Sequence, residues 1–394
     1  MKPSRFAPFA ATATALLATA AALLATVAAC DDPALSGPPP ATAGNSPNAT
    51  SASVAASASA ATAPPPPANV TSAPTPAPTP SGQSGASATS AKMTPQQLEA
   101  RYERCTGFIN AKDRNNLASC FTSDAVGGIA DMPPAHGGAA IVIKFYSETW
   151  EAFPDFTAEN ELVLVNGSHL AAFVLDRGTQ TAAFKGMGIP ATGKKIGLIG
   201  LHFIDFDAQG KMTLDMDAVD PSTIAGQLGV SPAPHRDVMS SGWQTRPVVI
   251  ATGSQTEIDN VALVKSLGAL FYGKKLDEYL SHFADDSVMH DMSAPADMKS
   301  KDSRPILTGL AAAFPDMTGT PAITWGAGDY VVDVTHWQAT NTGDAPMMGL
   351  KKTGKHVELT EFQVYRIQNG KVAELWMFRN GMAMMQQLGM LGGH

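Results

Sequence analysis

The tripeptide Phe153-Pro154-Asp155 returns 161 residues later as Phe314-Pro315-Asp316, and this repeat decides how the chain is organised. Other stretches recur at nearly the same distance: Thr192–Lys194 with Thr353–Lys355, Cys120–Val126 with His282–Val288, and Gln227–Gly229 with Gln387–Gly389. Offsets that drift by one residue are typical of short loop insertions between two copies of one unit. We therefore predict two tandem domains, at residues 93–230 and 255–394, joined by a linker at 231–254.

Each copy begins with a helical pattern and continues with alternating strands. Thr94, followed by Pro95 and Gln97, predicts a capping box at the start of the first helix. In the second copy Asn369-Gly370 predicts a two-residue hairpin. In the first copy the matching turn is longer and fits a Gly bulge that pairs Phe206 with Gly210. Helices followed by an antiparallel sheet predict an α+β fold.

Several short motifs stand in the same order in the chain: Gly137–Ile141 (Gly-Gly-Ala-Ala-Ile), Phe-Pro-Asp, Gly178-Thr179, Thr-Gly-Lys, Gly-Lys at the hairpin, and Asp220 or Asn380 seven residues before Gln-Leu-Gly. This ordered set resembles the SnoaL-like branch of the nuclear-transport-factor-2-like superfamily, which is related to the polyketide cyclases. The resemblance covers almost everything after residue 93. It implies that each copy is a cone of curved antiparallel sheet, packed on about three helices around an apolar cavity.

The N-terminus has the features of an export signal. Residues 1–29 combine Lys2 and Arg5 with an uncharged apolar run and small residues before Cys30, which resembles a bacterial lipoprotein signal in which Cys30 is acylated. A plain N-terminal membrane anchor is the alternative. Residues 30–92 are rich in Ala, Pro, Ser and Thr and predict a disordered tether. We expect a lipid-anchored protein of the bacterial cell envelope, without a choice between inner and outer membrane.

Composition and motifs argue against several classes of function. The chain has 27 basic against 35 acidic side chains and a pI near 5.6, which argues against nucleic acid as a partner. No zinc-ligand spacing and no phosphate-binding or dinucleotide-binding loop is evident, so we expect neither metal nor cofactor. The acidic run at 215–220 lacks the Gly turn and the Glu of a calcium loop. It is interpreted as a strand with Asp215 and Asp217 in solvent.

Two ionisable residues are candidates for chemistry in the first copy. The expected hairpin register places His202 and Asp220 on one apolar face, with Leu214 and Met216. Burial would raise the pKa of Asp220 towards the range of a general acid or base. Asp220 also matches the catalytic Asp that the resemblance implies. The alternatives are that Asp220 caps the following helix and that His202 is a hydrogen-bonded core residue; a direct pair of the two is not expected.

The second copy departs from this pattern. Its expected pocket face is formed by the side chains Glu361, Gln363, Tyr365, Glu374, Trp376 and Asn380. Asn380 replaces the titratable Asp, and an amide cannot transfer a proton near neutral pH. The aromatic side chains suit either a binding pocket or a filled core.

Cys105 and Cys120 fall on adjacent predicted helices of the first copy. After export they could form a disulfide, and two buried free thiols are the alternative.

These sequence features predict two alternative functions. The first is a lipid-anchored protein that binds an apolar or aromatic small molecule, with cofactor-free cyclisation, isomerisation or hydration in the first domain. The second is a non-catalytic binding or interaction protein of the envelope, whose two cones pair as an internal pseudo-dimer. The sequence decides neither the ligand nor whether either domain is an enzyme.

Overall fold

The computed structural model describes residues 92–132 and 135–390. The expected signal peptide, Cys30 and all of the expected tether except its last residue lie outside the described residues. Within the described part, no helix is both long and apolar enough to cross a bilayer.

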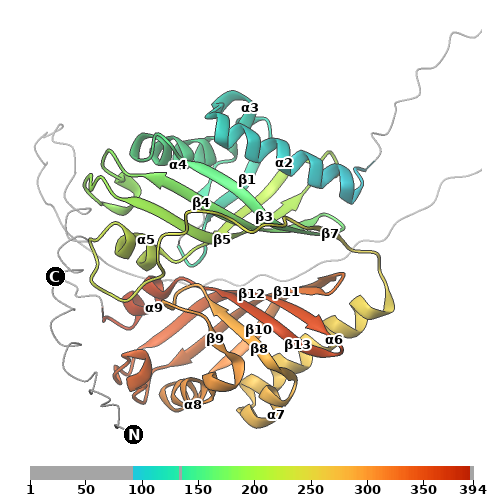
Figure 1. Ribbon diagram of the computed structural model, residues 1–394, viewed down its shortest axis with the longest axis vertical. Helices are drawn as coiled ribbons and strands as arrows, with labels where there is room; N and C mark the ends of the chain where they lie inside the picture. The colour runs from blue at the N-terminus through green and yellow to red at the C-terminus, as the bar shows by residue number, and fades with distance from the viewer. Residues whose placement is uncertain (1–91, 133–134, 391–394) are drawn as a thin grey trace, which may run out of the picture. The chain divides into compact units, whose positions relative to one another are not determined.

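The first domain is built from helices on one face of a sheet (Figure 1). Its elements are α2 (Pro95–Ala111), α3 (Arg114–Ala118), β1 (Phe121–Ile129), β2 (Ala135–His136), α4 (Ala139–Ala152), β3 (Thr157–Asn166), β4 (His169–Thr179), the short 3-10 helix η1 (Lys185–Met187), β5 (Lys195–Phe206), β6 (Met212–Ala218) and α5 (Pro221–Gln227). The following segment adds β7 (Val248–Ile250), which pairs in parallel with β3.

The second domain repeats this order. Its elements are α6 (Gln255–Tyr272), α7 (Leu276–Ser281), β8 (Phe283–Asp291), β9 (Met298–Lys299), η2 (Ser300–Ser303), α8 (Arg304–Ala313), β10 (Thr318–Ala327), β11 (Tyr330–Thr340), η3 (Pro346–Met348), β12 (His356–Gln368), β13 (Lys371–Phe378) and α9 (Gly381–Gln387).

The two sheets have equivalent strand orders, β2-β1-β6-β5-β4-β3-β7 and β9-β8-β13-β12-β11-β10. Most neighbours are antiparallel, but β1 pairs with β6 and β8 with β13 in parallel, so both sheets are mixed. The predicted α+β class is confirmed.

Local sequence signals act as expected at the element ends. Thr94 and Gln97 form the capping box of α2. Asn369 and Gly370 have φ values of 52° and 71°, which a two-residue hairpin of the primed type requires. In the first domain the turn is closed by Asp207 rather than by Phe206, since the Asp207 amide donates to the Lys211 carbonyl.

Each sheet buries both of its faces. In the first domain one face packs on α2 and α4, in a core that includes Tyr102, Trp150 and Leu198. The opposite face shares one hydrophobic cluster with the second sheet, in which Phe203 contacts Phe362 with ring centroids 5.8 Å apart. Strands buried on both faces lack a simple inside-outside alternation.

Hydrogen bonds also join the two domains. The Asn166 side chain donates to the Gly326 carbonyl over 2.8 Å. The Thr360 amide donates to the Asp131 carboxylate over 2.6 Å. These bonds add polar contacts to the hydrophobic cluster between the two sheets.

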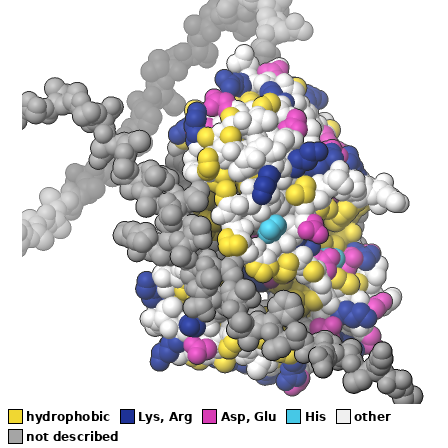
Figure 2. Space-filling view, turned by 60° about the vertical axis from the view of Figure 1, so that its left-hand side comes forward, with side chains coloured by type: hydrophobic (Ala, Val, Ile, Leu, Met, Phe, Trp, Pro, Cys, Tyr) yellow, Lys and Arg dark blue, Asp and Glu magenta, His cyan; other side chains and the backbone are white. Residues whose placement is uncertain are grey.

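Figure 2 shows basic and acidic side chains interspersed on the face in view, rather than gathered by sign. Among the described residues in view, charged side chains of one sign therefore form no continuous patch.

Candidate functional site

The helix-covered face of β5 and β6 carries the polar groups of the first domain. His202 on β5 lies opposite Asp217 on β6, and Ile204 lies opposite Asp215. A bulge next to the turn leaves Thr213 without a partner on β5. Because side chains on paired positions point the same way, His202, Asp215 and Asp217 share one face.

The register predicted from sequence is therefore wrong. It placed Leu214 and Met216 beside His202 and left Asp215 and Asp217 in solvent. A bulge that displaces the register by an odd number of residues exchanges the two faces of a strand. Leu214 and Met216 instead pack into the cluster between the two sheets.

The three side chains converge under α2. The His202 Nε2 atom lies 3.3 Å from the Asp217 Oδ1 atom. On the other side of the ring, Nδ1 lies 3.3 Å from the Tyr102 hydroxyl. Asp215 is nine-tenths buried, and its Oδ1 atom has no hydrogen-bond partner among the described residues. The Asp217 Oδ1 atom has the close contact with His202 Nε2, but the two atoms do not form a hydrogen bond. A buried carboxyl oxygen without a hydrogen-bond partner lowers the stability of the fold, which points to a functional role for these side chains.

The electrostatics of this cluster favour uncharged forms. Burial raises the pKa of Asp215 to about 7, with a further contribution from the charge of Asp217. Burial alone raises the pKa of Asp217 to about 7. Burial lowers the pKa of His202, and it raises that of Asp176, which lies on the same face of β4. Carboxyls that titrate near neutral pH can both accept and release protons.

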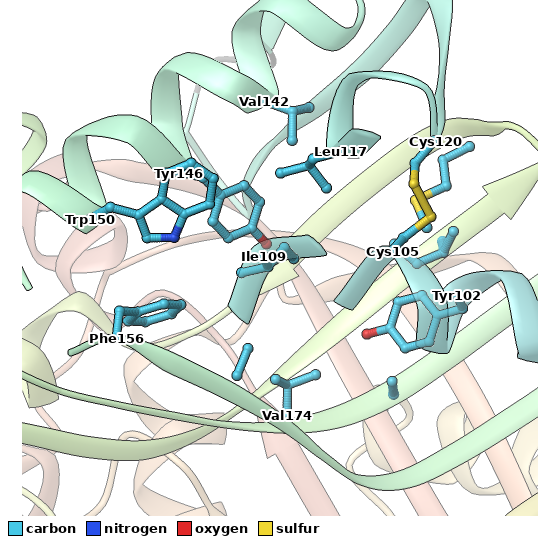
Figure 3. Close-up of a cluster of buried hydrophobic side chains, with 14 of the residues drawn as sticks. Tyr102, Cys105, Ile109, Leu117, Cys120, Val142, Tyr146, Trp150, Phe156 and Val174 are labelled. Atoms are coloured by element: carbon cyan, nitrogen blue, oxygen red, sulfur yellow. A yellow bond between two sulfur atoms is a disulfide. The ribbon is translucent and has the colours of Figure 1, made fainter. Parts of the chain in front are cut away.

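Aromatic side chains pack over this face (Figure 3). Tyr102 from α2 and Tyr146 from α4 direct their hydroxyl groups towards it, and Trp150 and Phe156 flank it. Burial raises the pKa of Tyr146 well above its usual range, so its hydroxyl remains a hydrogen-bond donor.

A disulfide links helix α2 to the sheet. Cys105 on α2 is bonded to Cys120, immediately before β1. Of the two alternatives left open by the sequence, a disulfide or two free thiols, the structure contains the disulfide. It joins the helix that carries Tyr102 to the strand that pairs with β6.

The same three residues could also hold a metal ion. His202, Asp215 and Asp217 each offer one ligand atom, and these atoms lie within 4.8 Å of one another. Imidazole and carboxylate suit divalent ions such as Zn²⁺.

Asp220 lies elsewhere and caps α5. Its carboxylate accepts hydrogen bonds from the backbone amides of Ser222 (3.4 Å) and Thr223 (2.9 Å) and from both hydroxyl groups. It stands at the N-cap position of α5, beyond the end of β6. The prediction that it shares a face with His202 is wrong because of the bulge, and the alternative interpretation, a helix cap, is what the structure places there.

The expected pocket residues of the second domain divide between two faces. Glu361, Gln363 and Tyr365 lie on the helix-covered face of β12, where Tyr365 packs with residues of α6 and its hydroxyl donates to Gln363. Trp376 lies on the opposite face, in the cluster between the sheets, and Glu374 shares that face. A bulge in the β12–β13 pair after the Ile367–Val372 position causes this correction to the predicted register.

Asn380 corresponds to Asp220 and also caps a helix. Its side-chain oxygen accepts the Ala383 amide over 2.9 Å, at the start of α9. Its amide nitrogen donates to the Ala130 carbonyl of the first domain over 3.1 Å. Asn380 is thus part of the contact between the domains.

The second cone lacks the polar cluster of the first. At the positions of His202, Asp215 and Asp217 it has Gln363, Leu375 and Met377, as the repeat aligns them. It has a different group instead. Arg379 lies 3.6 Å from Glu361 and forms a closer pair with Asp291. Burial raises the pKa of Glu361, and Arg379 opposes that effect.

Sequence reasoning missed Asp215, Asp217 and Tyr102 as site residues. One signal was available: Asp215 and Asp217 are two positions apart, so both must share a face, whichever face that is. Deciding the face required the position of the bulge, which the turn sequence does not specify.

The geometry defines a tandem pair of α+β cones, the first with a buried acid-base cluster and the second without it. The family model of the SnoaL-like polyketide cyclases matches residues 98–228 and again residues 262–388. The chain therefore belongs to this family and carries its domain twice.

Solved structures similar to this chain include three single-copy proteins. AclR of Streptomyces galilaeus is 25% identical over 35% of this chain and 85% of its own, with a TM-score of 0.32. IdmH of Streptomyces antibioticus is 24% identical over 33% of this chain and 98% of its own, with a TM-score of 0.30. A SnoaL-like protein of Jannaschia is 17% identical over 36% of this chain and 97% of its own, with a TM-score of 0.33. No curated protein matches the chain.

Proposed function

We propose that the first domain catalyses cofactor-free proton transfer on an apolar or aromatic carbonyl compound, as in cyclisation, isomerisation or hydration. The observation that carries this proposal is the pair of buried carboxyls, Asp215 and Asp217, whose pKa values are raised to about 7 beside His202. Two interacting carboxyls that titrate together hold one proton between them over part of the pH range. One then serves as base while the other serves as acid.

The reaction would use the residues as follows. The ionised Asp217 takes a proton from the carbon next to the substrate carbonyl, and the electron pair moves onto the carbonyl oxygen. The protonated Asp215 or the Tyr146 hydroxyl donates to that oxygen. Neutral His202, placed between Tyr102 and Asp217, orients the base. Return of the proton to another carbon, or attack of the enol on a second carbonyl, completes isomerisation or cyclisation.

The proposal can be tested with a simple model substrate that loses a proton from carbon, so that the natural substrate need not be known. 5-Nitrobenzisoxazole is flat and aromatic, and removal of its carbon-bound proton breaks the ring N–O bond and releases a coloured cyanonitrophenolate. We expect the full chain to accelerate this reaction, with a rate that rises as pH increases through about 7. Asp217→Asn should lower the rate by about 100-fold or more. The exposed Asp124→Asn is the matched control, and an Asp217→Asn rate equal to that of the control would refute the proposal.

For the second domain we propose a binding or structural role. The support is that the described positions of the second domain equivalent to His202, Asp215 and Asp217 hold other residue types. In this cone the buried carboxyl groups of Glu361 and Asp291 are paired with Arg379, whereas Asp215 and Asp217 of the first cone have no Arg or Lys partner within salt-bridge distance among the described residues.

We further propose that the protein is exported and held in the bacterial envelope through a lipid on Cys30. The support is the sequence of residues 1–30 alone. Metabolic labelling with an alkyne fatty acid should label the full chain in a bacterial host, and Cys30→Ser should abolish the label. Equal labelling of both would refute the anchor.

A further inference from the structure

A cavity between the two sheets lies apart from both cone interiors. It has a volume of about 340 Å³ and is lined by β5, the segment after α5, β8 and β13. Three aromatic side chains form its apolar wall: Trp243, Tyr330 and Trp376. The ring centroids of Trp243 and Tyr330 lie 6.3 Å and 6.4 Å from that of Trp376.

Two hydrogen-bond acceptors face each other in this cavity without a donor between them. The Nδ1 atom of His290 lies 2.9 Å from a carboxylate oxygen of Asp297. His290 and Arg236 lower the pKa of Asp297 to about 2, so this carboxylate is ionised. In the neutral form of His290, the ionised carboxylate favours the hydrogen on Nδ1. The Nε2 atom then carries a lone pair. It is buried and has no hydrogen-bond partner among the described residues.

The second acceptor is Glu374. One of its oxygens pairs with Arg366, and the other lies 3.9 Å from the His290 Nε2 atom. That separation is too long for a hydrogen bond. A single N–H-bearing group placed between the two atoms could donate to both, so the pair is a receptor for a donor.

The charges around the cavity favour a cation. Its lining contains four carboxylates, Asp220, Asp237, Asp297 and Glu374, together with Arg236 and His290. Asp297 is paired with Arg236 and one oxygen of Glu374 with Arg366, so the acceptor left for a cation is the second oxygen of Glu374. Aromatic faces stabilise organic cations through their quadrupoles.

We propose that this cavity binds a protonated primary amine with an aromatic or apolar body. The ammonium group donates to His290 Nε2 and to Glu374, and the body lies against Trp376 and Trp243. Neither domain contains this site alone, since Trp376, His290 and Glu374 come from the second domain and Trp243 from the segment that follows the first. The proposal does not rest on the chemistry assigned to the first cone.

Three probes that share a benzyl group test the chemistry of the site. Benzylamine is a cation with N–H donors, benzyltrimethylammonium is a cation without them, and benzyl alcohol is neutral. Titrations of the full chain at pH 7.5, followed by calorimetry and by tryptophan fluorescence, should give the tightest binding for benzylamine. We expect at least about tenfold weaker binding of the other two. Equal binding of benzylamine and benzyl alcohol would overturn the amine assignment, and equal binding of the two cations would overturn the bridging hydrogen bonds.

Variants locate the site. Glu374→Gln should weaken benzylamine binding at least about tenfold, while Glu358→Gln, an exposed glutamate on β12 of the same sheet, should leave it unchanged. His290→Phe keeps a ring stacked on Trp376 and removes the Nε2 acceptor, so it tests the same point should Glu374→Gln fail to fold. Benzylamine affinity that survives His290→Phe would overturn the proposal. Asp217→Asn, which tests the first cone, should leave benzylamine affinity unchanged, so the two proposals can fail separately.

Discussion

Replacing Asp217 by Asn should remove the pH dependence that this carboxyl gives to the stability of the first domain. Burial raises its pKa from 3.8 to about 7 in the folded chain. The folded state therefore holds the proton more tightly than the unfolded state. Its contribution to the free energy of unfolding is fully present below about pH 4, and it is lost as the pH rises through about 7.

The size of the effect follows from the shift. About three pKa units at about 1.4 kcal/mol each correspond to an upper limit of about 4 kcal/mol, of which roughly 2 to 3 kcal/mol falls between pH 5 and pH 8. Asn does not titrate, so Asp217→Asn lacks this loss. The free energy of unfolding of the variant minus that of the wild type should thus rise by roughly 2 to 3 kcal/mol between pH 5 and pH 8.

Urea unfolding at four pH values from 5 to 8, followed by circular dichroism, measures this difference. Any pH-independent cost of the buried amide cancels, because only the change with pH is used. The exposed Asp124→Asn should show no such change. A difference between Asp217→Asn and the wild type that stays within about 0.5 kcal/mol over this range would show that the carboxyl is solvated.

Three further changes test other parts of the structure. Cys105→Ser should lower the free energy of unfolding by about 3 kcal/mol, since the bridge closes a 15-residue separation, and urea unfolding with and without reductant should then agree for the variant only. Asp220→Ala should lower the free energy of unfolding by about 1 to 2 kcal/mol, because the α5 cap is lost. Asp220→Asn can still cap the helix and should lower it less, as measured by thermal unfolding. Equal losses in the two variants would argue against capping. Stoichiometric Zn²⁺ should inhibit the 5-nitrobenzisoxazole reaction and EDTA should restore it, because His202 and the two carboxylates can ligate the ion together; an unchanged rate would exclude a metal site that blocks the base.

The fold could be predicted from sequence because its signals are local and repeated. The Thr94 capping box and the Asn369-Gly370 hairpin each specify a short stretch of backbone, and the repeat extends every assignment to the other copy. The interior faces could not be predicted in the same way. Leu214 and Met216 are apolar and were therefore expected inside the cone, but the outer face of the sheet, to which they belong, is also apolar because it is buried against the second domain. With both faces apolar, hydrophobicity no longer distinguishes them, and one bulge decides which residues enter the cone.

The contact between the sheets also explains how the two copies can differ so much inside. The outer face of the first sheet, with Phe173, Leu201 and Phe203, is covered by Phe362 and Phe378 of the second. If the second domain serves to cover the outer face of the first sheet, its own outer face must remain apolar. The residues inside its cone can then change without loss of that contact. The outer positions of both sheets accordingly remain apolar, while His202 and Asp217 have Gln363 and Met377 as counterparts. Removing the second domain should therefore expose a large apolar face and impair the first, even if the second performs no chemistry.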